Sequence, residues 1–206
     1  VDDIDAARAV IARTGFPIMI KAAAGGGGRG IRIAAGQDEF DRFIPQAKAE
    51  ALAAFGDGGL YLEKVIERAR HIEVQVLGDG QRAIHCFERE CSLQRRRQKV
   101  WEEAPSISLP QAVREKLCAS AVALAESVRY SGAGTLEYLY DDASGDFYFI
   151  EMNTRIQVEH PVTEAITGID LVREMLKVAG GEKLRLTQSE IAICGHAIEV
   201  RINAED

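Results

Sequence analysis

Two strand-like runs joined by a short polar turn constrain the fold more than any other feature of this sequence. Residues 134–140 and 146–152 flank the turn Asp141-Asp-Ala-Ser-Gly145, an arrangement that predicts a β-hairpin. Earlier in the chain, apolar and polar residues alternate over 72–76, just before a second tight turn at Gly78-Asp-Gly80. The sequence therefore predicts antiparallel β-structure in these two regions.

The remaining pattern mixes helices with short strands. Helical spacing of apolar residues, with glycine or proline near the ends, predicts helices over 4–14, 38–55 and 110–128, and shorter helices that begin at Pro161 and Asp170. Further strands are predicted over 16–21, 31–34, 60–65, 83–89 and 197–202. Glu67-Arg-Ala-Arg70 is interpreted as a polar connection between lobes. The predicted fold class is α+β, with two unequal lobes and largely antiparallel sheets.

Composition limits the functional class. The 206 residues include 25 Lys and Arg against 32 Asp and Glu, and the net charge of −7 argues against binding nucleic acid through its phosphates. No apolar run reaches the ~18–20 residues that cross a bilayer, so we expect no membrane partner. Cys86, Cys91, Cys118 and Cys194 are too scattered for a disulfide framework or a CxxC zinc site. Reduced thiols and a cytoplasmic location, or an organelle matrix in a eukaryote, are expected.

A glycine-rich loop, Ala22-Ala-Ala-Gly-Gly-Gly-Gly-Arg-Gly30, follows Lys21 between two predicted strands. Backbone N–H groups with no side chains around them suit a polyphosphate. The loop lacks the GxxxxGK[ST] pattern of a P-loop, and a strand follows it where a dinucleotide-binding motif would have a helix. A phosphate contact and a flexible hairpin tip are both consistent with this loop alone.

The predicted hairpin places oxygen ligands on one face. Strand side chains repeat every second residue, so Glu137 lies opposite in phase to its two neighbours, while Glu151 and Asn153 share a face. If the two strands pair, two carboxylates and an amide oxygen converge, a set that suits Mg²⁺ or Mn²⁺. An ordinary polar outer face of a sheet is the alternative interpretation.

The segment after the hairpin adds a cation and another carboxylate. Continued strand alternation would align Arg155, Gln157 and Glu159 with the oxygen ligands. A cation beside a metal-bound anion can hold a second small anion, and a neighbouring carboxylate could accept its proton. The run Gln94-Arg-Arg-Arg-Gln-Lys99 is either a solvated charged face or, in a chain this acidic, part of an anion pocket.

Several longer segments carry a family resemblance. They are residues 20–30, 63–66, 70–75, 92–99, 102–105, 132–137, 149–162 and 195–206. Together they resemble biotin carboxylase, the ATP-grasp component of biotin-dependent carboxylases, and residues 155–160 are the most specific part of this resemblance. It implies an ATP-grasp fold and the ATP-dependent carboxylation of biotin by bicarbonate through carboxyphosphate.

The resemblance also implies a role for individual residues. The implied ATP-binding residues are Lys21, Gly27, Gly28, Glu63, Lys64, Val65, Ile66, His71, Gln94, Arg97, Glu137 and Glu151. Glu137, Glu151 and Asn153 would hold the metal, and Lys99, Arg155, Gln157 and Val158 would bind bicarbonate. Glu159 would be the general base, and Arg201 would bind biotin and stabilise its ureido oxygen. The implied catalytic residues are Glu159, Arg155, Arg201 and Lys99.

The same resemblance implies a domain plan and partners. Residues 1–65 would form the ATP-grasp lid, and residues 66–206 part of the larger lobe with the metal, bicarbonate and biotin sites. The cofactors would be ATP and Mg²⁺ or Mn²⁺, with biotin as a substrate on a carrier domain outside this chain. A carboxyltransferase and a homo-oligomeric parent protein are further implied partners. Because the ATP-grasp fold would be incomplete at both ends, we expect weak ATP binding and little turnover from the isolated chain.

Two residues of the chain depart from the family pattern at positions that bear on the site. Two other functions also remain as alternatives. Ala24 replaces the first glycine of the family's longer run, and Arg97 stands where histidine is usual, which changes the donor geometry. A ligase similar to carbamoyl-phosphate synthetase, which also activates bicarbonate with ATP, is the first alternative. A non-catalytic ATP-binding domain is the second.

Overall fold

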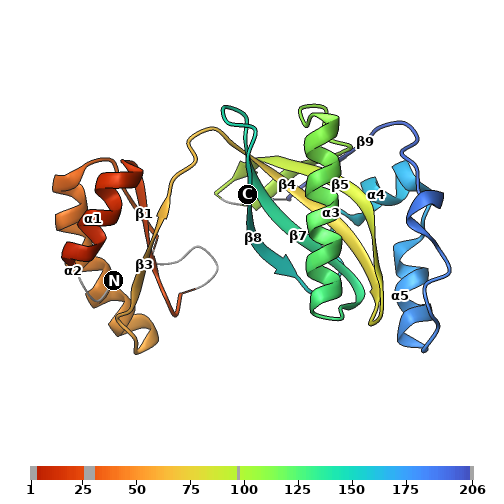
Figure 1. The fold of residues 1–206 in the computed structure, drawn as a ribbon, viewed down its shortest axis with the longest axis horizontal. Helices are drawn as coiled ribbons and strands as arrows, with labels where there is room; N and C mark the ends of the chain where they lie inside the picture. Colours follow the sequence, from red (N-terminus) through yellow and green to blue (C-terminus); the bar gives the residue numbers. More distant parts are fainter. Residues whose placement is uncertain (1–3, 26–30, 97, 205–206) are drawn as a thin grey trace. The chain divides into compact units, whose positions relative to one another are not determined.

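Two antiparallel sheets organise the chain, and the predicted α+β fold class is confirmed. The structure, a computed structural model, describes residues 4–25, 31–96 and 98–204. The chain separates into two compact units, Val1–Glu67 and Arg68–Asp206 (Figure 1). Each unit has its own sheet, in the strand orders β2–β1–β3 and β8–β7–β4–β5–β6–β9.

The first unit packs two helices against the three-stranded sheet. Its elements are α1 (Ile4–Thr14), β1 (Ile18–Ala22), β2 (Arg32–Ala34), α2 (Gln37–Phe55) and β3 (Leu60–Lys64). Phe40 and Ile44 on one side of α2 are buried against Ile18 and Ile20 of the central strand β1. Helix α1 ends at Gly15, which takes the left-handed φ of 72° that an L-residue with a side chain avoids.

The second unit packs helices on both faces of the six-stranded sheet. Its strands are β4 (Ala69–Asp79), β5 (Ala83–Arg95), β6 (Gln98–Ala104), β7 (Ser131–Asp141), β8 (Phe147–Asn153) and β9 (Ala197–Val200). Its helices are α3 (Gln111–Ser127), α4 (His160–Thr167), α5 (Leu171–Ala179) and the short 3₁₀ helix η1 (Gln188–Glu190). Figure 1 shows α3 crossing one face of the sheet, and the strand pairs between described residues are all antiparallel.

Strand alternation decides what each face of this sheet carries. Ile72, Val74 and Val76 of β4 point to the α3 face, where they pack with Leu136 and with apolar residues of α3. The intervening residues of β4 must therefore point to the other face. Glu73 and Gln75 are the residues at these positions, and both are fully buried. The opposite face of β4 is consequently buried and polar at these two positions, whereas Leu77 further along it packs in an apolar cluster.

The sequence missed strand β6 and displaced several helix ends by one residue. Strand β6 was not predicted, because it follows the charged segment 94–99 and its own residues lack a clear alternation. Helix α3 begins at Gln111, so Pro110 is the residue before the first helical position. Proline suits this place because it has no backbone N–H that the helix would need to satisfy.

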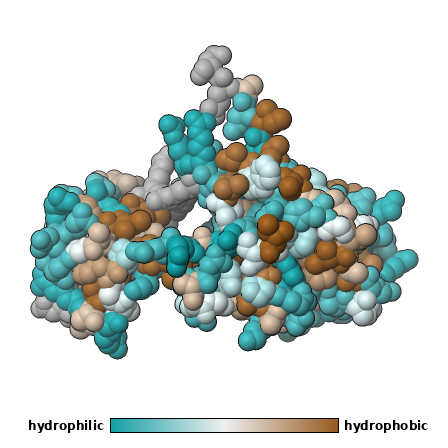
Figure 2. Space-filling model, turned by 90° about the horizontal axis from the view of Figure 1, so that it is seen from above, coloured by the Kyte–Doolittle hydropathy of each residue, from teal (hydrophilic) through white to brown (hydrophobic). Residues whose placement is uncertain are grey.

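The surface of the molecule is mainly polar. Figure 2 shows hydrophilic side chains over most of the visible face, with hydrophobic side chains in small separate groups, as a folded protein ordinarily has. None of the helices formed by the described residues combines the length and the hydropathy that a bilayer crossing requires.

Asp79, at the end of β4, makes stability depend on pH. Its carboxylate accepts backbone N–H groups from Gln81 (2.9 Å), Arg82 (3.0 Å) and Leu184 (3.0 Å). Burial acts to raise the pKa of Asp79, but these hydrogen bonds outweigh burial and lower it. A carboxyl group whose pKa is lowered by folding stabilises the folded state at pH values above its ordinary pKa. This stabilisation is lost as the pH falls through the lowered pKa.

We expect Asp79→Asn to lower the free energy of unfolding by about 1–3 kcal/mol at neutral pH, because its amide faces a backbone donor. Urea unfolding at several pH values measures this difference, which should shrink below about pH 4 as the wild-type carboxylate is protonated. Asp146→Asn, at an exposed turn position, is the control. A difference that stays constant down to about pH 2 would contradict the assignment.

Candidate active site

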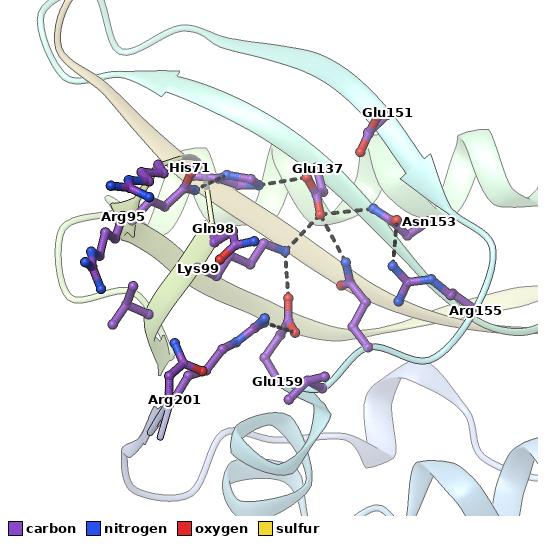
Figure 3. Close-up of a pocket in the computed structure, with 16 residues that line it drawn as sticks. His71, Arg95, Gln98, Lys99, Glu137, Glu151, Asn153, Arg155, Glu159 and Arg201 are labelled. Atoms are coloured by element: carbon purple, nitrogen blue, oxygen red, sulfur yellow. Dashed lines mark hydrogen bonds and ion pairs between the residues drawn. The ribbon is translucent and has the colours of Figure 1, made fainter. Parts of the chain in front are cut away.

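A cavity of about 760 Å³ lies in the second unit, on the polar face of the sheet (Figure 3). It brings together many of the residues that the sequence singled out. These are His71, Gln94, Lys99, Glu137, Glu151, Asn153, Arg155, Gln157, Val158, Glu159 and Arg201. They come from β4, the β5–β6 hairpin, β7, β8, the loop before α4 and the segment just after β9.

Lys99 is the central cation of this cavity. Its Nζ atom lies 2.5 Å from Glu73 Oε2, 2.9 Å from Glu137 Oε1 and 2.6 Å from Glu159 Oε1. Burial acts to lower the pKa of Lys99, but the surrounding carboxylates outweigh burial and raise it. Lys99 therefore stays protonated and holds three carboxylates from different elements at one point.

Glu137 has hydrogen bonds on one oxygen and an ion-pair contact on the other. Oε1 accepts from Lys99, from Asn153 Nδ2 (3.0 Å) and from Gln157 Nε2 (3.1 Å), while Oε2 lies 3.0 Å from His71 Nε2. His71 Nδ1 accepts the amide N–H of Gln94 at 2.8 Å, and His71 Nε2 is buried without a hydrogen-bond partner among the described residues. Burial acts to raise the pKa of Glu137, but His71 and Lys99 outweigh burial and lower it.

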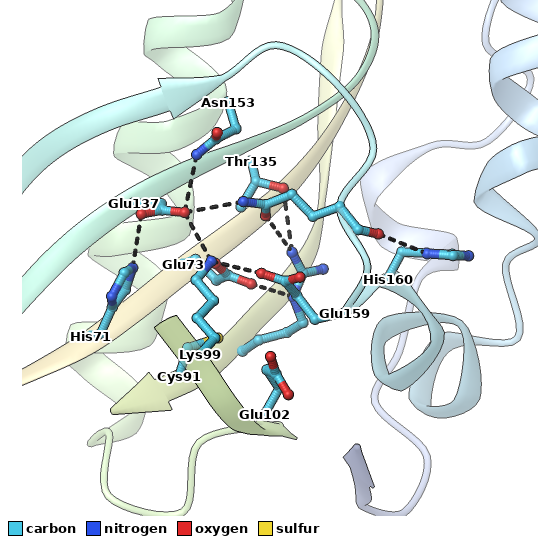
Figure 4. A network of polar contacts seen from close by, with 12 residues as sticks. His71, Glu73, Cys91, Lys99, Glu102, Thr135, Glu137, Asn153, Glu159 and His160 are labelled. Carbon is cyan, nitrogen blue, oxygen red and sulfur yellow. Dashed lines mark hydrogen bonds and ion pairs between the residues drawn. The ribbon is translucent and has the colours of Figure 1, made fainter. Parts of the chain in front are cut away.

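A fully buried arginine, Arg89, which the sequence did not reveal as part of the site, contacts this cluster, of which Figure 4 shows Glu73, Lys99 and Glu159. Arg89 Nε donates to Glu73 Oε1 at 2.6 Å, and Nη2 donates to Gln157 Oε1 at 3.3 Å. Further donations go to Gln75, Thr135 and Thr163. The signal in the sequence was the alternation of Glu73 and Gln75 with apolar residues, which we used only to predict a strand.

The segment after β8 reaches the cavity by a different path from the one predicted. Strand β8 ends at Asn153, so the strand alternation that was expected to align Arg155, Gln157 and Glu159 is wrong. Residues 154–159 form a loop and turn, and Glu159 is the residue before the first turn of α4. Their side chains still line the cavity, because the turn carries them back towards Lys99 and Glu137.

The members of this loop differ in burial. Gln157 and Glu159 are 6% and 2% exposed, whereas Arg155 and Val158 are exposed. Arg155 Nη2 lies 3.5 Å from Asn153 Oδ1, so the guanidinium group stands beside the predicted metal ligands (Figure 3). Glu159 and Gln157 thus have fixed positions in the wall, and Arg155 has room to meet a ligand.

Arg201 closes the other side of the cavity. Its Nε donates to Glu102 Oε1 at 2.9 Å, and its Nη2 donates to Glu159 Oε2 at 2.9 Å. Glu159 therefore has one oxygen on Lys99 and the other on Arg201. A carboxylate held between two cations at the wall of a cavity is well placed to receive a proton from a bound anion.

Oxygen ligands in the cavity fit a hard divalent cation. Glu137 and Glu151 are directly opposite on β7 and β8, and Asn153 lies one step further on the same strand. Two carboxylates and an amide oxygen are the donor set that Mg²⁺ or Mn²⁺ prefers. Glu137 Oε1 accepts three donors, so binding an ion there would require some of these hydrogen bonds to be exchanged. Glu151 is exposed, and Figure 3 shows it apart from the hydrogen bonds that join Glu137 and Asn153.

The other predicted ATP-binding residues belong to the first unit or lie outside the described residues. Lys21 of β1 forms an ion pair with Glu63 of β3 at 2.5 Å, and the Val65 N–H donates to Pro17 O. Lys64 Nζ donates to Thr14 O, and Ile66 is the second residue after the end of β3. The predicted positions Gly27, Gly28 and Arg97 lie outside the described residues.

Comparison with known proteins identifies the family. The model of the carbamoyl-phosphate synthase L chain ATP-binding domain matches residues 1–187. A biotin carboxylase from Nostoc sp. is 58% identical over 193 residues, which cover 93% of this chain and 43% of that protein. A biotin carboxylase from Pseudomonas aeruginosa is 52% identical over 206 residues, which cover 100% of this chain and 45% of that protein.

Solved structures agree with these sequences. The biotin carboxylase domain of the Hydrogenobacter thermophilus 2-oxoglutarate carboxylase, a dimer with MgADP and bicarbonate, has a TM-score of 0.87 and 51% identity, covering 99% of this chain and 45% of that chain. Biotin carboxylase from Campylobacter jejuni has a TM-score of 0.88 and 50% identity, covering 98% and 45%. The chain thus spans less than half the length of these relatives. It belongs to the family of the carbamoyl-phosphate synthase L chain ATP-binding domain, and its resemblance to biotin carboxylase is confirmed.

Proposed function

We propose that the protein carrying this chain carboxylates biotin with bicarbonate and ATP, through carboxyphosphate. The observation that carries this proposal is the position of Glu159, held between Lys99 and Arg201 at the wall of a polar cavity. The relatives named above favour this function over a ligase of the carbamoyl-phosphate synthetase type. The acyl acceptor of the parent protein, such as an acyl-CoA, pyruvate or urea, would be chosen by a separate carboxyltransferase.

The proposed role of each residue follows from its chemistry. Lys99 and Arg155 would bind bicarbonate, together with Gln157 and the backbone of Val158. The positive charges of Lys99 and Arg155 would offset the repulsion between bicarbonate and the γ-phosphate. Glu159 would accept the bicarbonate proton, which makes the oxygen nucleophilic. Arg201 would then face the ureido oxygen of biotin, where negative charge develops as the nitrogen attacks CO₂.

Further residues are proposed for the nucleotide and its metal. Glu137, Glu151 and Asn153 would hold Mg²⁺ or Mn²⁺, whose chemistry is to neutralise the phosphate oxygens. His71 and Gln94 would contact the nucleoside, as would the segment Glu63 to Ile66. Lys21 and the loop with Gly27 and Gly28 would bind phosphates, with residues 1–65 as the lid and 66–206 as part of the large lobe. Arg97 would add a further donor to the nucleotide.

We also propose the setting in which this chain works. A biotin carrier domain would deliver the substrate, a carboxyltransferase would consume the product, and the parent protein would form a homo-oligomer in the cytoplasm or an organelle matrix. The isolated chain is expected to bind ATP weakly and to turn over little.

A single-turnover assay with ¹⁴C-bicarbonate tests the function on the natural protein that carries this chain. We expect label in biotin only when ATP, a divalent metal and biotin are all present. Label that requires ammonia in place of biotin would instead indicate a carbamoyl-phosphate synthetase-like ligase. ATP binding without any labelled product would indicate a non-catalytic domain.

A further inference from the structure

Two glutamates behind Arg201 face each other across neighbouring strands. Glu102 of β6 and Glu199 of β9 are directly opposite in the antiparallel register. Such cross-strand pairs have Cβ atoms about 4.5–5.5 Å apart, and two like charges at this position are unfavourable. The placement therefore requires something that relieves the repulsion between these carboxyl groups.

Each glutamate of this pair has one oxygen without a partner. Among the described residues, Glu102 Oε2 and Glu199 Oε2 are both buried and have no hydrogen-bond partner. The whole Glu102 side chain is 0% exposed, so water does not reach it. A buried acceptor without a donor costs roughly 1–3 kcal/mol, and more if it is charged. Two such oxygens on facing residues are both satisfied if one proton lies between them.

The charges around the pair do not compensate two carboxylates. Arg201 is the cation in direct contact, and it is already shared between Glu102 Oε1 and Glu159 Oε2. Arg89 and His160 also act electrostatically on Glu199. The guanidinium group of Arg89, however, donates to Glu73 and to its other partners. The Nδ1 atom of His160 contacts the carbonyl oxygen of Gln157. With Glu102 and Glu199 both ionised, Arg201 would be the nearby cation for three carboxylates, those of Glu102, Glu159 and Glu199.

We propose that Glu102 and Glu199 share one proton at neutral pH and act as a positioning pair for Arg201. The pair then has one negative charge instead of two, and Glu102 Oε1 still holds Arg201 Nε. Arg201 consequently keeps enough positive charge for a ligand that presents a partial negative oxygen beside Glu159. That this ligand is the ureido oxygen of biotin rests on the proposed function, whereas the shared proton does not.

The electrostatic surroundings support this assignment. Burial raises the pKa of Glu102, and Glu159 and Glu199 raise it further while Arg201 opposes them. Burial likewise raises the pKa of Glu199, with a further contribution from Glu159. Both shifts favour retention of a proton at a pH where an exposed glutamate is ionised.

The first experiment detects the proton directly and needs no substrate. In the protein labelled with ¹³C at glutamate carboxyl carbons, we expect one resonance in the protonated or proton-sharing range at neutral pH, titrating well above the ordinary value of about 4.3. Glu102→Gln and Glu199→Gln assign this resonance, since either substitution should remove it. Glu103→Gln, on the adjacent position of β6, should leave it in place. If all glutamates are ionised by about pH 6, the shared proton is refuted.

The second experiment tests the positioning role by kinetics. A glutamine at 102 keeps an acceptor for Arg201 Nε and donates an N–H to Glu199, as protonated Glu102 would. We expect Glu102→Ala to raise the KM for biotin by roughly tenfold or more with a smaller change in the KM for ATP, and Glu102→Gln to restore most of this loss.

The pH profile separates positioning from a merely structural role. We expect kcat/KM for biotin to fall at alkaline pH in the wild type and in Glu103→Gln as the pair ionises, and this limb to disappear in Glu102→Gln. An alkaline limb that is unchanged in Glu102→Gln would refute the positioning role. If the protein carboxylates no biotin, the proposed function fails while the carboxyl resonance still decides the shared proton.

Discussion

Replacing Arg89 by methionine is expected to lower the free energy of unfolding by about 3–5 kcal/mol. The Arg89 side chain is fully buried and donates to Glu73, Gln75, Thr135, Gln157 and Thr163. Methionine has a comparable length but no donor. Its introduction leaves Glu73 buried with Lys99 as the remaining cation, and it removes the donors of several buried oxygens.

Urea unfolding followed by circular dichroism measures this loss. Arg173→Met, on the exposed side of α5, is the matched control. Its free energy of unfolding is expected to lie within about 0.5 kcal/mol of the wild-type value. The double variant Arg89→Met with Glu73→Leu should lose less than the sum of the single variants, because no buried charge is left opposite an apolar side chain. Arg89→Met within about 1 kcal/mol of wild type would show that the network contributes little to stability.

Glu159→Gln is expected to lower the rate of biotin carboxylation by about 10²–10⁴-fold. Glutamine has nearly the shape of glutamate, but its one oxygen can replace only one of the two that accept from Lys99 and Arg201, and its NH2 group faces the other cation. It cannot take the proton of bicarbonate, so the nucleophile stays inactive. The affinity for ATP should change by no more than about twofold, because the loss is in a step that follows binding.

Steady-state kinetics with biotin and bicarbonate, together with an equilibrium ATP-binding measurement, separate these effects. Glu103→Gln is the control, since Glu103 faces His196 at 3.4 Å and not the cavity. Retention of more than about a tenth of the wild-type rate in Glu159→Gln would show that another group accepts the proton.

The sequence predicted the fold class and the hairpin that carries the oxygen ligands. Glu137 and Glu151 are opposite each other in the β7–β8 register, because the alternation of residues and the length of the turn determine the pairing. Asp170 was predicted to cap a helix for the same kind of local reason, and its carboxylate does accept the Arg173 N–H at 2.8 Å at the start of α5. Features determined by neighbouring residues were therefore accessible from the sequence.

Features determined by distant residues were not accessible. Arg89 is a single arginine in a strand, and nothing near it in the sequence shows that Glu73 and Gln157 will enclose it. The path of residues 154–159 was also missed, because strand alternation was extended past Asn153 into a turn. Glu102 and Glu199 are 97 positions apart, so their opposition appears only once β6 and β9 are paired.

The long sequence separation of the residues around Lys99 has a consequence for folding. Lys99 joins side chains 26, 38 and 60 positions away, and Arg201 reaches back 99 positions to Glu102. Such high contact order slows folding, because the chain loses loop entropy before these contacts form. The cavity is thus completed late, and an anion bound in it would slow the global unfolding of the second unit as well as local opening at the cavity.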